Sequence, residues 1–319
     1  MKAIVTRRFG SPDGLELVEI ESPIPSPGEV LIETEAIGVG GVDAAIRRGT
    51  LGHGYPHGMI PGGEVAGSVL QVGDGVSEQW LGKRVWAHTG TSGGYADHAT
   101  ARLADITVLP SALSSSDAVA LGSAATVAHF ALKHAHFAAD ETLLIRGASG
   151  SIGIATLEHA VRQGASRIAV TTASSSRGQK LLAMGATDVL GRSGKDASDH
   201  APDFDVIIDV VGGADVPSFI DQLAPNGRMI LVGAVAGFPP PTFGMKIMET
   251  FQHSRSVATF SLASVPVEER NTARAAQFEA AVRGTLHPVV HATMPLADAA
   301  KAHEAMDAGT VFGRIVLTN

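Results

Sequence analysis

The sequence contains no cysteine, so it can form no disulfide. It has no apolar run close to the roughly 18 to 20 residues that a membrane-spanning helix needs, and no block of basic residues accompanies its net charge of −8. We therefore expect neither a membrane partner nor a nucleic-acid partner. Arg7 and Arg8 come soon after the first residue, without the apolar core of a signal peptide, which predicts a cytoplasmic protein.

Apolar residues are plentiful enough for a large core. They make up 45% of the 319 residues, against 18% charged residues, and this balance excludes a disordered chain. A chain of this length predicts two domains of ordinary size or one large domain.

The pattern of apolar residues changes along the chain. The first third has short apolar pieces separated by Gly and Pro, which predicts a mostly β, barrel-like unit. Strand and helix patterns then alternate, with candidate strands at 142–146, 167–171, 188–190, 206–211, 228–232 and 257–260. This alternation predicts an α/β domain with a doubly wound parallel sheet.

The tail differs from the alternating segment and predicts a return to the first unit. It has helical patterns at 271–283 and 297–307 and a closing strand at 314–317. We therefore predict one domain at 119–260, and another at 1–118 that is completed by 261–319.

The stretch 144–153, Leu-Ile-Arg-Gly-Ala-Ser-Gly-Ser-Ile-Gly, reads as a strand end, a tight turn and a helix start. Ala148, Gly150 and Gly153 form a variant of the dinucleotide-binding fingerprint, because Gly150 lets the backbone approach a pyrophosphate and Gly153 lets the helix pack on the strand. The pyrophosphate would be bound by Gly150, Ser151, Ile152 and Gly153 at the positive end of the helix. A tight turn without a ligand would use the same glycines.

The choice of dinucleotide depends on the end of the second strand of this domain. NAD sites usually place an acid there for the ribose 2′-hydroxyl, yet no acid occurs between Glu158 and Asp188. Ser174 and Arg177 suit a 2′-phosphate instead, because arginine can bind it through two charge-assisted hydrogen bonds. The sequence therefore predicts NADPH as the cofactor. The alternative is that Arg177 is a solvated residue at the start of the next helix and binds no phosphate.

Several ordered motifs together resemble the zinc-free quinone oxidoreductase group of the medium-chain dehydrogenase/reductase superfamily. They are residues 36–43 with 47–49, Pro61-Gly62-Gly63-Glu64-Val65-Ala66-Gly67, Gly93-Gly94-Tyr95-Ala96-Asp97, Asp209-Val210-Val211-Gly212-Gly213, Leu231-Val232-Gly233 and Gly313-Arg314-Ile315-Val316-Leu317. The resemblance covers essentially the whole chain. It implies a GroES-like barrel domain, a Rossmann domain, an active site in the cleft, and a homodimer joined near 257–260.

The resemblance also implies roles for single residues. The nicotinamide and its ribose would be lined by Thr126, Val211, Gly212, Val232, Gly233 and Ala234, and Arg314 would be a second contact for the pyrophosphate. Zinc-dependent relatives hold their catalytic metal with a Cys and a His at the positions of Gly40 and Gly63. Since glycine cannot ligate, no metal is expected.

The substrate pocket departs from the pattern of the group. Gly40 stands where these reductases commonly have Asn, and Leu51 replaces a usual Tyr. Tyr55 and Asp43 are the candidate catalytic residues. His53, His57 or water are alternative proton donors. The remaining alternative is that the residues of the 50–60 loop have no catalytic role.

The predicted function is that of an NADPH-dependent, metal-free oxidoreductase. The nicotinamide supplies the hydride chemistry, and without a metal the substrates that fit are small molecules that already accept hydride readily, namely quinones and α,β-unsaturated carbonyl compounds. Two alternatives stay open: a metal-free alcohol or ketone reductase, and a non-catalytic NADPH-binding sensor or structural protein.

Overall fold

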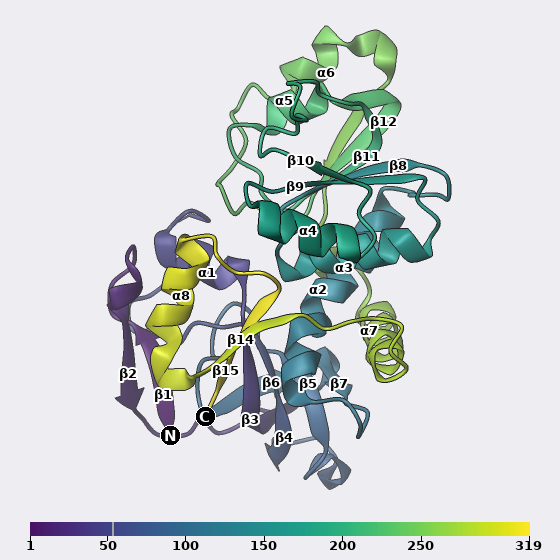
Figure 1. Ribbon diagram of the computed structural model, residues 1–319. Helices are drawn as coiled ribbons and strands as arrows, with labels where there is room; N and C mark the ends of the chain where they lie inside the picture. Colours follow the sequence, from purple (N-terminus) through teal and green to yellow (C-terminus); the bar gives the residue numbers. More distant parts are fainter. Residues whose placement is uncertain (53) are drawn as a thin grey trace. The chain divides into compact units, whose positions relative to one another are not determined.

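The computed structural model describes residues 1–52 and 54–319, so the candidate His53 lies outside the described residues. The chain divides into two compact units (Figure 1). Unit 1 contains Met1–Thr126 and Val265–Asn319, and unit 2 contains Val127–Ser264. Helix α2 (Ser115–His134) carries the chain from the first unit into the second.

Unit 2 contains a parallel sheet of six strands in the order β10-β9-β8-β11-β12-β13. The strands are β8 (Thr142–Arg146), β9 (Arg167–Thr171), β10 (Asp188–Leu190), β11 (Phe204–Asp209), β12 (Leu223–Leu231) and β13 (Ser256–Thr259). In sequence order this is 3-2-1-4-5-6, the order of the Rossmann fold. The predicted doubly wound parallel sheet is confirmed.

Helices lie on both sides of this sheet, with α3 (Ser151–Arg162) and α4 (Ser175–Ala183) on one side and α5 (Val216–Ile220) and α6 (Met245–Glu249) on the other (Figure 1). The central strands are apolar along their length because both faces are covered. Leu144, Ile207 and Met229 have no exposed surface and join one apolar cluster with Phe204 and Phe219.

Unit 1 is mostly β. A sheet contains β14-β15-β3-β4-β5-β7 in this order, and β6 also pairs with β3. The strands are β3 (Glu29–Val39), β4 (Glu64–Val72), β5 (Arg84–His88), β6 (His98–Arg102), β7 (Ile106–Val108), β14 (Val290–Pro295) and β15 (Arg314–Thr318). A separate antiparallel pair consists of β1 (Lys2–Thr6) and β2 (Leu15–Glu19).

Unit 1 also contains the start of α2 and the helices α1 (Gly41–Arg48), α7 (Val267–Val282) and α8 (Ala299–Asp307). The last strand, β15, runs antiparallel to β3, with Ile315 opposite Val39. The strand near the C-terminus is thus part of the same sheet as strands β3 to β7 from the first third of the chain. Strand β14, next to β15, is not among the strands predicted from the sequence.

Candidate functional site

The turn between β8 and α3 has the geometry of a close helix–strand contact. Gly147 has a φ of +81°, a left-handed conformation that glycine adopts without strain. A Cβ atom on Gly153 would lie 2.5 Å from the Cα of Ala148 and from the oxygen of Gly147, so only glycine fits there. A Cβ atom on Gly150 would have its nearest neighbour 3.6 Å away.

The first turn of α3 offers amide groups to a ligand. The N–H of Ile154 donates to the oxygen of Gly150 at 2.9 Å, and the N–H groups of Ser151, Ile152 and Gly153 have no hydrogen-bond partner in the described chain. Gly150 has no side chain to cap them, and the first turn contains no acid. Such a helix start attracts an anion, because the amide dipoles leave a partial positive charge there.

The end of β9 contains hydroxyls and a guanidinium. Ser174 precedes α4, and its Oγ accepts a hydrogen bond from the N–H of Arg177 at 3.4 Å. Arg177 lies half-buried in the first turn of α4, which contains no acid. The predicted pair therefore lies next to the carboxyl end of β9.

The remaining predicted residues of unit 2 follow the next two strands. Val211 and Gly212 come after β11, and Val232, Gly233 and Ala234 come after β12. Because all strands of this sheet are parallel, these loops share one edge with the glycine turn. The carboxyl edge at the point where strand order reverses is where α/β sheets bind ligands.

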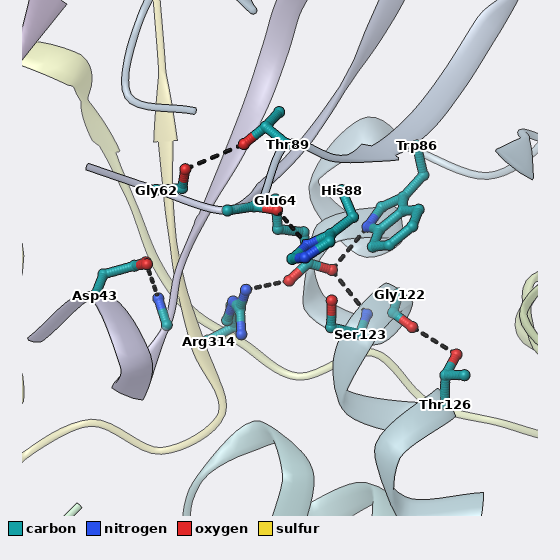
Figure 2. Close-up of polar contacts among 12 residues, drawn as sticks. Asp43, Gly62, Glu64, Trp86, His88, Thr89, Gly122, Ser123, Thr126 and Arg314 are labelled. Atoms are coloured by element: carbon teal, nitrogen blue, oxygen red, sulfur yellow. Dashed lines mark hydrogen bonds and ion pairs between the residues drawn. The ribbon is translucent and has the colours of Figure 1, made fainter. Parts of the chain in front are cut away.

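In unit 1, Glu64 is the centre of a buried polar group (Figure 2). Its Oε1 accepts hydrogen bonds from the indole N–H of Trp86 at 2.7 Å and from the amide of Ser123 at 2.8 Å. Its Oε2 accepts a bond from the guanidinium of Arg314. Arg314 lies against the backbone of β3, since a Cβ atom on Gly38 would be 2.6 Å from its Nη2. The carboxylate thus fixes the position of the arginine.

Asp43 is buried in the first turn of α1. Its Oδ2 accepts hydrogen bonds from the amide of Gly40 at 2.8 Å and from the hydroxyl of Tyr95 at 3.2 Å, and its Oδ1 has no hydrogen-bond partner within the described chain. Burial raises the pKa of Asp43 from 3.8 to about 6, although Gly40 and the charge of Arg314 act in the opposite direction. This carboxyl can therefore exchange a proton near neutral pH.

Tyr95 joins Asp43 to a buried histidine. Arg47 donates from Nε to Nδ1 of His303 at 3.1 Å, so the neutral ring has its proton on Nε2. That nitrogen donates to the hydroxyl of Tyr95 at 3.1 Å, and the hydroxyl donates to Asp43. Burial lowers the pKa of His303 from 6.5 to about 4, with the charge of Arg47 acting in the same direction.

No hydrogen bond in the described residues links Tyr55 and Asp43, the two candidate catalytic residues. Tyr55 is half-buried in a segment without regular structure, and it has no hydrogen-bond partner in the described residues. The tyrosine that binds Asp43 is Tyr95. His57 contacts the oxygen of Arg7 through Nδ1 at 3.0 Å and is exposed.

Thr126 is fully buried in unit 1. Its hydroxyl lies 2.7 Å from the oxygen of Gly122 and 2.9 Å from Oε1 of Gln277 (Figure 2 shows the first contact). The side-chain amide of Gln277 also donates to the oxygen of Ala125 at 3.1 Å. The hydroxyl proton of Thr126 is therefore used inside this unit, and its oxygen can only accept from a ligand.

The described residues contain no group of three or more His, Asp or Glu side chains that could hold a metal ion. Gly40 is the residue before α1, and Gly63 precedes β4. A Cβ atom on Gly63 would lie 2.3 Å from the oxygen of Gly90, so this position has no room for a ligating side chain. Neither Gly40 nor Gly63 can therefore supply a ligand to a zinc ion.

A Rossmann sheet with an open helix start at its reversal point, together with a β-rich second unit, defines the class of two-domain nucleotide-dependent dehydrogenases and reductases. Residues 26–134 match the alcohol dehydrogenase GroES-like domain, and residues 184–317 match a domain described as zinc-binding dehydrogenase. The chain is 32% identical to quinone oxidoreductase of Homo sapiens, with 99% of this chain and 97% of the relative covered. It belongs to the quinone oxidoreductase group of the medium-chain dehydrogenase/reductase superfamily and is an oxidoreductase.

Two further relatives extend this result. Acryloyl-coenzyme A reductase of Metallosphaera sedula is 26% identical, with all of both chains covered. The structure of Escherichia coli quinone oxidoreductase complexed with NADPH is 25% identical and has a TM-score of 0.91, again with all of both chains covered. The described residues include no helix that is long and apolar enough to cross a membrane.

Sequence reasoning missed two sets of buried residues. Tyr95 and His303 are far from Asp43 along the chain, and no spacing rule connects them. Arg146 and Asp209 form a buried ion pair at 2.6 Å. Their signal was available, since a charged residue directly follows each of two apolar runs, in Leu-Leu-Ile-Arg and Val-Ile-Ile-Asp.

Proposed function

We propose that this oxidoreductase uses NADPH to reduce quinones or the carbon–carbon double bond of α,β-unsaturated carbonyl compounds, without a metal ion. The observation that carries the proposal is the combination of an open, acid-free helix start after β8 with the acid-free, arginine-bearing turn after β9. The NADPH complex of the similar Escherichia coli enzyme supports the cofactor.

The adenosine half of NADPH would bind along the carboxyl edge of the sheet in unit 2. The amides of Ser151, Ile152 and Gly153 would bind the pyrophosphate, because they have no other partner in the described chain. Gly150 leaves room for its approach. Ser174 and Arg177 would bind the 2′-phosphate, since the arginine can donate two charge-assisted hydrogen bonds to it.

The nicotinamide half would lie against the loops that follow β11 and β12, with Val211, Gly212, Val232, Gly233 and Ala234 as its predicted neighbours. Thr126 and Arg314 are the remaining predicted cofactor contacts. Arg314 is suited to an anionic group, because Glu64 fixes its orientation through a hydrogen bond from Nη2 alone.

The chain's own part in the reaction would be to bind, to orient and to manage one proton. NADPH, when bound, supplies the hydride. Asp43 is a candidate proton store, because burial raises its pKa to about 6 and Tyr95 binds its Oδ2. Tyr55 and water are the other candidate donors to the reduced substrate.

The substrate class is inferred from the absence of a fitting metal site and from the relatives. A saturated ketone usually needs a Lewis acid or a strong proton donor to accept hydride, whereas quinones and conjugated carbonyls are already electrophilic. Both kinds of acceptor are present in the names of the relatives, as quinone oxidoreductase and as acryloyl-coenzyme A reductase.

We also propose a homodimer that forms along β13. This strand lies at the edge of the six-stranded sheet, and its outer backbone groups are available for pairing. Light scattering after size-exclusion chromatography should give twice the chain mass, and replacing Val257 with Pro should lower it, since proline cannot donate a strand hydrogen bond. A monomeric wild type would reject this proposal.

The function is tested by the initial rate of NADPH and NADH oxidation with a naphthoquinone, an alkyl enone and a saturated aldehyde. Turnover of the quinone or the enone, with NADPH preferred, would support the proposal. Turnover of the saturated aldehyde alone would favour the alcohol or ketone reductase. Tight NADPH binding without any turnover would favour the non-catalytic sensor.

A further inference from the structure

The buried ion pair of Arg146 and Asp209 lies at the reversal point of strand order in unit 2. Arg146 is the last residue of β8, Asp209 is the last residue of β11, and the two are direct neighbours in the strand register. Arg146 Nη1 and Asp209 Oδ2 are 2.6 Å apart, and the exposed fractions of their side chains are 3% and 0%. In sheets of this order, ligands bind next to this point.

The pair uses the polar backbone groups of the loop that follows β11. Asp209 Oδ1 accepts hydrogen bonds from the amides of Val211 at 2.8 Å and Gly212 at 3.1 Å. Arg146 Nη1 donates to the oxygen of Gly212 at 3.3 Å, and the oxygen of Val211 accepts from Ala236 at 2.8 Å. Neither Val211 nor Gly212 therefore has an amide left to donate to a ligand, so these residues can offer only carbonyl oxygens and apolar surface.

The same loop lies against the glycine turn. A Cβ atom on Gly147 would be 3.2 Å from the Cβ of Val210 and 3.2 Å from Cγ2 of Val211. The amide of Val210 donates to the oxygen of Arg146 at 3.2 Å. A shift of the loop would therefore change the space beside the turn.

The position of the loop depends on the charges of both Arg146 and Asp209, because both side chains are buried. The guanidinium of Arg146 lies 3.9 Å from the ring centre of Phe219 and away from solvent. Burial raises the pKa of Asp209, while the charge of Arg146 and the two amides act against that increase. Removing one charge would leave the other buried and uncompensated, so the loop would lose its fixed position.

We propose that Arg146 and Asp209 are positioning residues for the nicotinamide half of NADPH, which hold the 210–213 loop as a rigid wall without hydrogen-bond donors. The proposal rests on the proposed use of NADPH. Binding of the nicotinamide half should depend on this pair, whereas binding of the adenosine half should not. The pair contacts the 210–213 loop and has no contact with Ser174 or Arg177 in the described chain.

A second Arg–Asp pair in the same sheet, whose side chains are 36% and 33% exposed, provides a control. Arg167 and Asp188 begin β9 and β10, at the opposite edge, with Nη2 and Oδ1 2.9 Å apart. Arg167 also faces a phenylalanine ring, that of Phe204, at 5.4 Å. Asp188→Asn therefore controls for the loss of a carboxylate that pairs with arginine in this sheet, away from the 210–213 loop.

The test compares the binding of NADPH with that of 2′,5′-ADP, which lacks the nicotinamide half, by calorimetry on the full chain. Asp209→Asn should weaken NADPH binding by about tenfold or more and leave 2′,5′-ADP binding within about twofold. Arg146→Lys keeps the charge without the planar fork, and it should weaken NADPH alone, by about three- to tenfold. Asp188→Asn should change neither ligand.

Equal weakening of both ligands in Asp209→Asn, or unchanged NADPH binding, would overturn the positioning role. If Asp209→Asn fails to fold, the outcome with Arg146→Lys decides in the same way. A wild-type chain that binds 2′,5′-ADP but shows the same affinity for NADPH would reject this inference and leave the proposed cofactor in place. A wild-type chain that binds neither ligand would reject the proposed function itself.

Discussion

Asp43 and His303 are buried ionisable side chains whose pKa values change in opposite directions. Asp43 has its pKa raised from 3.8 to about 6, so its folded form binds the proton more tightly, and its stabilisation is greatest below pH 4 and is lost as pH rises through 6. His303 has its pKa lowered from 6.5 to about 4, so its contribution is lost as pH falls from 6.5 to 4. The two effects oppose each other between pH 4 and 6.

We predict that single substitutions separate these effects. On acidification from pH 6.5 to 4, Asp43→Asn should make the free energy of unfolding fall more steeply than in the wild type, because the contribution of His303 is no longer opposed by that of Asp43. His303→Gln should make it rise on acidification. Each residue's contribution to the free energy of unfolding changes by about 3 kcal/mol in total across this range, from a shift of about two pKa units. Urea unfolding at three pH values measures it, and parallel curves for the three proteins would contradict the prediction.

Arg177 is the residue from which the cofactor preference can be tested. Arg177→Ala should reduce the preference for NADPH over NADH by about tenfold or more, because a charge-assisted pair with the 2′-phosphate is lost while the contacts to NADH stay. The ratio of kcat/KM for the two cofactors measures this. Arg283→Ala, an exposed arginine at the end of α7, is the control and should leave the ratio unchanged.

At the scale of an element, the two glycines at the start of α3 have different roles: Gly153 is required for packing, and Gly150 is predicted to be required for cofactor binding. A Cβ atom on Gly153 would clash with the backbone of the turn at 2.5 Å, whereas one on Gly150 would be in ordinary van der Waals contact, 3.6 Å from the oxygen of Gly147. Gly153→Ala should therefore lower the free energy of unfolding by roughly 1–3 kcal/mol. Gly150→Ala should keep the melting temperature and weaken NADPH binding, because the methyl group would occupy the space of the pyrophosphate. Loss of stability in both variants would contradict this division.

The elements differ in how far the sequence predicted them. The strands at 142–146, 167–171 and 188–190 have the predicted bounds, because each is a short apolar run between turn residues. β12 begins at Leu223, five residues before the predicted start at 228, since Pro225 and Gly227 lie inside it and usually indicate a turn. β14 was missed because its half-buried alternation contains a histidine and a proline.

At the scale of the molecule, the absence of a fitting metal site has a direct consequence. Protein dialysed against EDTA should keep both its melting temperature and its rate of NADPH oxidation, because the described residues offer no group of ligands for zinc. Added zinc should not raise the rate. A loss of activity on dialysis that zinc restores would contradict the prediction.

The domain limits at 118 and 260 stay predictions from the sequence, and the compact units divide after Thr126 and Ser264.

The sequence by itself determined the alternation of strands and helices, the glycine turn, the missing acid after β9 and the glycines at positions 40 and 63. These are local properties, because each depends on residues within one turn or one strand. Only the tertiary structure decided that Asp43 pairs with Tyr95, and that Arg146 pairs with Asp209 across two strands 63 residues apart. Burial and charge pairing arise between distant segments, so no local pattern contains them.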